Sequence, residues 1–74
     1  MLLDINERGR AARELMKVVR SDASVRLRVE AVRLLEGTGD DTFEDELFGV
    51  LDDALDPRLR AAVGRALWRL LRDL

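Results

Sequence analysis

Apolar residues recur along this chain at intervals of three and four positions, which is the spacing of an amphipathic α-helix. No stretch shows the sustained alternation of apolar and polar residues that marks a half-buried strand. We therefore predict an all-α fold built from four helices. The positions expected to face the core are Ile5, Ala12, Leu15, Met16 and Val19 in the first stretch, Val25, Leu27, Val29, Ala31, Val32, Leu34 and Leu35 in the second, Phe43, Leu47, Val50, Leu51 and Ala54 in the third, and Leu59, Val63, Ala66, Leu67, Leu70, Leu71 and Leu74 in the fourth.

Capping residues and helix breakers set the ends of the first two predicted helices. The first begins after Asp4 and ends near Arg20, and either Ser21 or Asp22 caps the second, because short polar side chains can accept hydrogen bonds from a helix N-terminus. Two glycines within residues 36–40 favour a C-cap and a loop.

The third and fourth helices have clearer starts. The third is predicted to begin at Asp41 or Thr42. Asp56 followed by Pro57 places a side-chain acceptor at the N-cap and a residue with fixed φ at the first helical position. The fourth helix is therefore predicted to run from Pro57 to the end of the chain.

Four helices joined by short breaks predict two antiparallel helical hairpins within a single domain of residues 1–74. The first hairpin covers about 5–36 and the second about 41–74. The hairpins either stack as a repeat pair or close into a compact four-helix bundle. Solenoids of such hairpins need three or more units for stability. We therefore expect another copy or another protein to cover an open apolar face.

The composition excludes most catalytic chemistry. Among its 74 residues, the chain has no cysteine and no histidine. Disulfides, zinc–thiolate sites and serine–histidine–aspartate triads are therefore excluded. We predict that the protein is not an enzyme, has no metal site or cofactor, and takes no small-molecule substrate.

An internal repeat is the most specific pattern in the sequence. Residues 22–26 (DASVR) recur as residues 56–60 (DPRLR), at a spacing of 34. Upstream, residues 15–19 match residues 47–51 at a spacing of 32. The two spacings predict a two-residue difference in the turn between the helices of each hairpin.

Residues 56–67 (DPRLRAAVGRAL) resemble the second-helix signature of HEAT and HEAT-like repeats of the phycobilisome-lyase type. The resemblance covers most of the chain as two units. It implies that an aspartate caps the second helix of each unit and that the following arginine pairs with aspartates within or between repeats. By position, these roles fall to Asp22 with Arg26 and to Asp56 with Arg60.

Charge is segregated along the chain. Residues 37–56 carry eight acidic side chains and no basic one, whereas residues 57–74 carry five arginines and one acid. Such segregation can steer association with a partner of opposite charge. The predicted partner-binding residues are the acids Glu44, Asp45, Asp52 and Asp53 of the third helix and the aromatic residues Phe48 and Trp68. Trp68 also fits a core or half-buried edge position, because large aromatic side chains are usually well buried. Three other apolar residues that do not all fit inward stripes, Leu2, Leu3 and Leu74, are further candidates for such a contact.

These patterns predict a non-enzymatic protein–protein interaction or scaffold module that associates with itself, as a homodimer, or with another protein. One alternative is a small nucleic-acid-binding regulator that uses the arginine-rich faces of the first and fourth helices. We do not expect nucleic acid, because the sequence pI is about 5.1. Another alternative is a six-helix, death-fold-like adaptor domain.

The sequence also carries expectations about origin and location. Twelve arginines stand against the single lysine, Lys17, which is typical of a GC-rich bacterial genome. No apolar run approaches the length of about 18 residues that a membrane span needs. The expected location is the cytoplasm.

Overall fold

The computed structural model describes residues 5–72, which form four α-helices and no strand. The all-α prediction is confirmed. No helix in this range is both long and apolar enough to cross a bilayer. Leu2, Leu3 and Leu74 lie outside the described residues, as does the side chain of Ile5. The helices are α1 (Ile5–Arg20), α2 (Val25–Thr38), α3 (Glu44–Asp53) and α4 (Pro57–Arg72).

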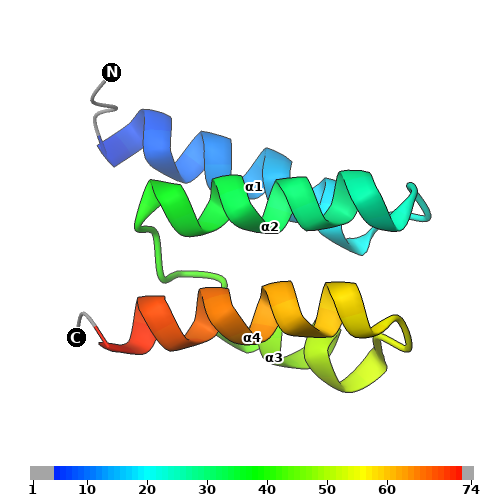
Figure 1. The fold of residues 1–74 in the computed structure, drawn as a ribbon. Helices are drawn as coiled ribbons and strands as arrows, with labels where there is room; N and C mark the ends of the chain where they lie inside the picture. The colour runs from blue at the N-terminus through cyan, green and yellow to red at the C-terminus, as the bar shows by residue number, and fades with distance from the viewer. Residues whose placement is uncertain (1–4, 73–74) are drawn as a thin grey trace.

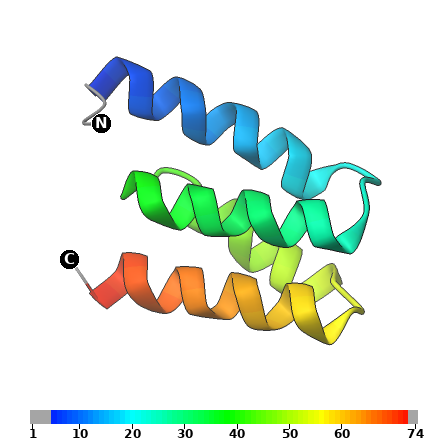
Figure 2. The ribbon, with the colours of Figure 1, turned by 45° about the horizontal axis from the view of Figure 1, so that its top comes forward.

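The helices form two hairpins that lie one above the other (Figure 1). Helix α1 packs along α2, α3 packs along α4, and α2 packs against α4 to join the hairpins. Figure 2 shows α2 between α1 and α4, with α3 behind α2 and α4. The first hairpin therefore meets the second mainly through α2, and each hairpin keeps one side that no other helix covers.

A single apolar core is shared by all four helices. Its fully buried large side chains come from α1, α2, α3 and α4, and most predicted core positions are confirmed. The shortest helix, α3, contributes Leu47, which is completely buried. The buried core residues are Ala12, Met16, Val19, Ala31, Val32, Leu35, Leu47, Ala54, Leu59, Val63, Ala66, Leu67 and Leu70.

Three predicted core positions are wrong. The side chains of Leu27 and Leu34 are 59 % and 60 % exposed, and Leu71 is also exposed. Leu27 and Leu34 stand at a heptad spacing and therefore lie on one side of α2. The neighbouring helices α1 and α4 bury the other apolar side chains of α2. Its apolar arc is wider than these two helices can cover, so Leu27 and Leu34 stay exposed.

The predicted cap of the second helix is also wrong. Helix α2 is capped by Ser24, whose Oγ accepts a hydrogen bond from the backbone N–H of Leu27 at 3.2 Å. Ser21 instead donates its hydroxyl to the carbonyl of Val18 at 2.7 Å and so satisfies the end of α1. Asp22 lies between these two residues, exposed to solvent.

Helix α3 begins at Glu44, later than predicted. Asp40 Oδ1 accepts the backbone N–H of Thr42 at 2.8 Å, so the preceding residues form a turn instead of helix. Helix α2 ends at Thr38 and is capped by Gly39, which has φ 70° and donates its N–H to the carbonyl of Glu36. Gly39 is suited to this left-handed cap because it has no Cβ.

The same arginine contact closes both hairpins. Arg28 Nε donates to the carbonyl of Val19 at 2.8 Å, and Arg60 Nη1 donates to the carbonyl of Leu51 at 2.7 Å. Each arginine thereby satisfies a carbonyl that the end of a helix leaves without an intrahelical partner. The two acceptors and the two donor arginines stand at the same spacing, from position 19 to 51 and from position 28 to 60.

The caps follow the same period. The carbonyls of Ser24 and Asp56 accept the backbone N–H groups of Arg28 and Arg60 at 3.0 and 3.1 Å. The two hairpins therefore match residue by residue when position 28 is aligned with position 60. We call this spacing the period of the structure. The alignment of residues 22–26 with 56–60 is wrong, because Asp22 is not at the position that Asp56 occupies.

Substitution of the two candidate caps tests this register. Ser24→Ala removes the side-chain acceptor of α2 and is expected to lower the free energy of unfolding by about 1 kcal/mol. Asp22→Ala is expected to leave it unchanged, because Asp22 caps no helix. Urea unfolding followed by circular dichroism measures both, and a larger loss for Asp22→Ala would contradict the assignment.

Candidate interaction site

Asp56 organises the turn between α3 and α4. Its Oδ1 accepts the backbone N–H of Arg58 at 2.8 Å, and its carboxylate pairs with the Arg58 guanidinium at 3.0 and 3.2 Å. The hydrogen bonds from the Arg58 side chain, followed by that from its backbone, hold the pKa of Asp56 below its ordinary value. The same pair raises the pKa of Arg58. Asp56 therefore pairs with Arg58, while Arg60 binds the carbonyls of α3 and its C-cap.

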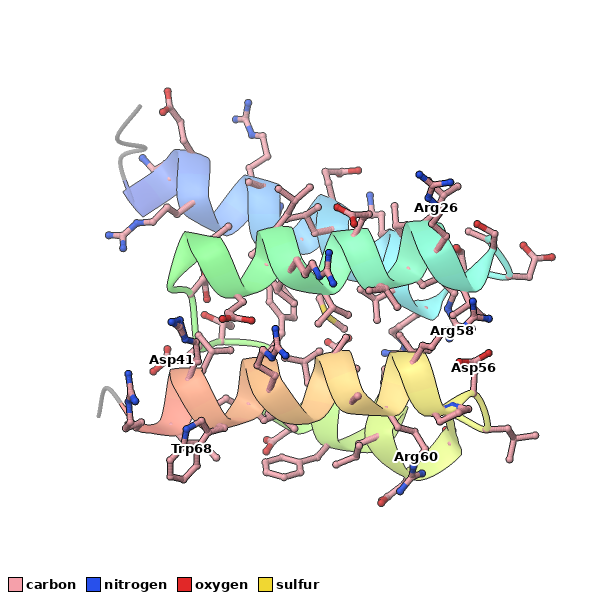
Figure 3. All side chains as sticks on the ribbon, in the orientation of Figure 1. Arg26, Asp41, Asp56, Arg58, Arg60 and Trp68 are labelled. Carbon is pink, nitrogen blue, oxygen red and sulfur yellow. The ribbon has the colours of Figure 1, made fainter. Side chains whose placement is uncertain are left out.

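Asp22 and Arg26 do not form the pair that the repeat signature implies, since no ion pair within residues 5–72 joins them. Both side chains are exposed. Arg26 projects from α2 on the side away from α4, as Figure 3 shows. The signature residues of the two hairpins thus differ in their contacts.

One acidic residue of α3 binds α1. Glu46 Oε2 accepts from Arg20 Nη1 at 2.9 Å, which fixes the side of α3 that faces the first hairpin. Phe48 is two residues further along, a rotation of about 200° around the helix. Its side chain therefore faces away from α1, and it is 44 % exposed. Asp45 and Asp52 lie three and four residues from Phe48 and share its side of α3.

Trp68 projects from α4 on the side away from α2 (Figure 3). It is 65 % exposed, although it is the only tryptophan of the chain. Leu71 follows three residues later on the same helix and is also exposed. We define the second outer surface as the exposed side of the α3–α4 hairpin, formed by Asp45, Phe48, Asp52, Trp68 and Leu71.

Two of the predicted partner-binding acids lie elsewhere. Asp53 lines a hollow between the hairpins together with Arg20 and Arg28. Glu44 is half-buried at the start of α3, and its Oε1 is buried with no hydrogen-bond partner. Of the acids predicted from the sequence, the second outer surface therefore keeps Asp45 and Asp52.

The first hairpin has an outer surface that the sequence analysis missed. Glu36 Oε1 pairs with Arg69 Nε of α4 at 3.2 Å, and Leu34, two residues earlier, consequently faces away from α4. Val18 lies two residues before Arg20, which pairs with Glu46 of α3, and Val18 therefore faces away from α3. We define the first outer surface as Ala11, Leu15, Val18, Leu27, Leu34 and Gly37.

An apolar groove runs along this first outer surface. It is lined by Ala11 and Leu15 of α1 and by Leu34 and Gly37 of α2, with few polar atoms. A signal for this surface is present in the sequence, namely the heptad spacing of Leu27 and Leu34. Periodicity alone places both residues in the core, because it does not tell which apolar side of a helix receives a neighbour.

A second hollow is lined by residues of α2, α4 and the loop after α2, and it contains more basic than acidic side chains. Arg65 and Arg72 line it beside Trp68. The hollow also contains Glu36 and Asp41, and Glu36 already pairs with one of its arginines. Its full set of charged residues is Arg33, Glu36, Asp41, Arg65, Arg69 and Arg72.

The acidic side chains of α3 diverge. Within residues 5–72 no group of three or more acidic residues is arranged to hold a metal ion.

Comparison of the chain with protein-family models, with curated proteins and with solved structures finds no match. The exposed surfaces are therefore the features of the molecule that indicate its function.

The contact between Asp56 and Arg58 predicts a pH dependence. A carboxylate with a lowered pKa in the folded state stabilises the fold above its unfolded pKa, and this contribution disappears as the pH falls through the folded pKa. Asp56→Asn keeps a capping side chain but loses the charge. We expect this variant to be less stable than the wild type at neutral pH, with the difference shrinking on acidification.

Urea midpoints measured from neutral to strongly acidic pH test this expectation. Asp22→Asn, which changes an exposed loop carboxylate, is the matched control. A deficit of Asp56→Asn that stays constant over the whole pH range would contradict the role of the Asp56 charge.

Proposed function

We propose that this protein is a non-enzymatic protein-interaction module of the HEAT-like helical-hairpin type. The second outer surface is its principal docking site, and the cytoplasm its location. The observation that carries the proposal is the exposure of Trp68 beside a fully formed apolar core. A small domain gains stability by burying its largest apolar side chains, so a tryptophan left outside the core is suited to burial against a partner.

The chemistry of the surface supports a protein partner. Exposed Phe48, Trp68 and Leu71 supply apolar area, and aromatic residues are enriched where binding energy concentrates. Asp45 and Asp52 add acidic groups beside them, which favours a partner that presents basic groups around an apolar patch. No cleft that encloses a small substrate is needed for this role.

The HEAT-like part of the proposal is supported by the repeated local contacts. Each hairpin has a capped second helix and an arginine that reaches back to the end of the first helix, at a constant period. Hairpins that repeat in this way stack through their sides. A six-helix adaptor fold receives no support, because residues 5–72 form four helices.

Nucleic-acid binding is the second candidate, and the basic hollow between α2 and α4 is the observation that favours it. Arg65 and Arg72 lie there beside Trp68, a combination that can bind phosphates and stack on bases. However, Glu36 and Asp41 lie in the same hollow and would repel a phosphate backbone. We therefore rank a protein partner first.

Site-specific photo-crosslinking in cells tests the proposal. A photoreactive phenylalanine analogue replaces Phe48 or Trp68 in turn, and in a control it replaces Leu55, which is 95 % exposed but lies outside the second outer surface. We expect discrete protein adducts from positions 48 and 68 and none of the same mass from position 55.

The identity of the adduct separates the candidates. An adduct removed by nuclease would support the nucleic-acid alternative. Equal labelling from all three positions, or none from positions 48 and 68, would contradict the proposed docking site.

A further inference from the structure

Two ion pairs within the described residues join the two hairpins. Arg20 of α1 pairs with Glu46 of α3, and Glu36 of α2 pairs with Arg69 of α4. The hairpins are equivalent at a constant period, as their arginine contacts show. The second outer surface is therefore the equivalent of the side of the first hairpin that already holds a neighbour.

We infer that a second copy of this chain docks its first outer surface on the second outer surface, so that copies stack head to tail. The inference rests on the proposed function of the second outer surface and names its partner. In such a stack, the helices at the junction between copies are arranged like those at the junction between the two hairpins of one copy, with different side chains in contact.

The central contact of this junction pairs a large side chain with a small one. At the period, the residue of the second hairpin that is equivalent to Glu36 is Trp68, and the residue of the first hairpin that is equivalent to Arg69 is Gly37. The ion pair within one copy is thus replaced between copies by Trp68 above Gly37. A Cβ added at Gly37 would meet nothing within 4 Å, so the space above this residue is open.

The surroundings of Gly37 are suited to an indole. Gly37 lines the apolar groove together with Ala11, Leu15 and Leu34. Trp68 is the largest side chain of the second outer surface, and it is mostly exposed. Both partners of this contact are therefore accessible on the isolated chain, and each covers apolar surface of the other.

One charge contact between α4 and the α2 helix of the next copy is complementary, although Arg33 of the next copy lies at the same place as its acidic partner. Arg33 and Ala62 line one small hollow between α2 and α4. Their equivalents across the junction are Arg65 of one copy and Glu30 of the next. Glu30 is exposed and pairs with the neighbouring Arg33 at 3.2 Å, and its carboxylate can also accept from Arg65.

The α3 side of the junction keeps one uncompensated acidic charge and is its least favourable part. Arg20 and Glu46 correspond to Asp52 and Glu14, two acids that would repel each other. Glu14 is bound to Lys17 at 3.0 Å, and this ammonium group offsets part of the repulsion. The apolar contact and the Arg65 contact therefore decide the junction.

A head-to-tail junction uses two different surfaces, which permits a test that a symmetric dimer cannot pass. Leu34→Asp blocks the first outer surface, and Trp68→Asp blocks the second. Both side chains are exposed, so helicity by circular dichroism is expected to remain that of the wild type. Leu55→Asp, at an exposed position outside both surfaces, is the matched control.

Light scattering after size exclusion gives the masses. We expect the mass of the wild type and of Leu55→Asp to rise with concentration, and each blocked variant alone to stay a monomer. An equimolar mixture of Leu34→Asp and Trp68→Asp leaves one intact surface on each chain. It is expected to give a heterodimer with twice the monomer mass and nothing larger.

Other outcomes overturn the inference and remain distinct from failure of the proposed function. If Leu34→Asp still forms a dimer while Trp68→Asp does not, the second outer surface binds its own copy symmetrically. If the wild type is a monomer at every concentration, self-stacking is excluded, and the crosslinking adducts decide whether another protein occupies the surface. A mixture that stays monomeric while the wild type associates also contradicts head-to-tail stacking.

Discussion

A helical hairpin has two sides, and a pair of hairpins can cover only one side of each. In this protein the covered sides meet in one core, to which every helix contributes. The uncovered sides still carry apolar residues, above all Trp68 on α4 and Leu34 on α2. The exposed apolar surfaces therefore follow from the number of hairpins.

Two arginines give this arrangement its regularity. Arg28 and Arg60 each cross from the second helix of a hairpin to a carbonyl at the end of the first, and so fix the same relation between the helices. Because both hairpins are closed alike, a contact on one hairpin identifies its counterpart on the other. At this period Trp68 is the equivalent of Glu36, so it occupies on the second hairpin the position from which Glu36 contacts α4 on the first.

Most of the fold could be predicted from the sequence because helix periodicity and caps are local. Pro57 starts α4 as expected, and the stripe that includes Val63 and Leu67 is buried. The misplaced features depend on neighbours. Ser24 and Asp22 are both good caps, and the choice depends on how α1 ends; for Leu34, burial depends on which side of α2 is covered. For Trp68 the sequence leaves a half-buried core position and an interface position open; the side chain is 65 % exposed, and its role as a partner contact stays a prediction.

Trp68 also provides the most direct measurement, since it is the only tryptophan in a chain without tyrosine. Its fluorescence emission and acrylamide quenching can be followed across a dilution series, alongside the mass of the protein. Long-wavelength, readily quenched emission is expected from the dilute monomer. A shift to shorter wavelength with protection from quencher is expected as the mass rises. Short-wavelength, protected emission from the monomer would place Trp68 in the core and contradict its exposure. Unchanged emission during association would exclude Trp68 from the interface between copies.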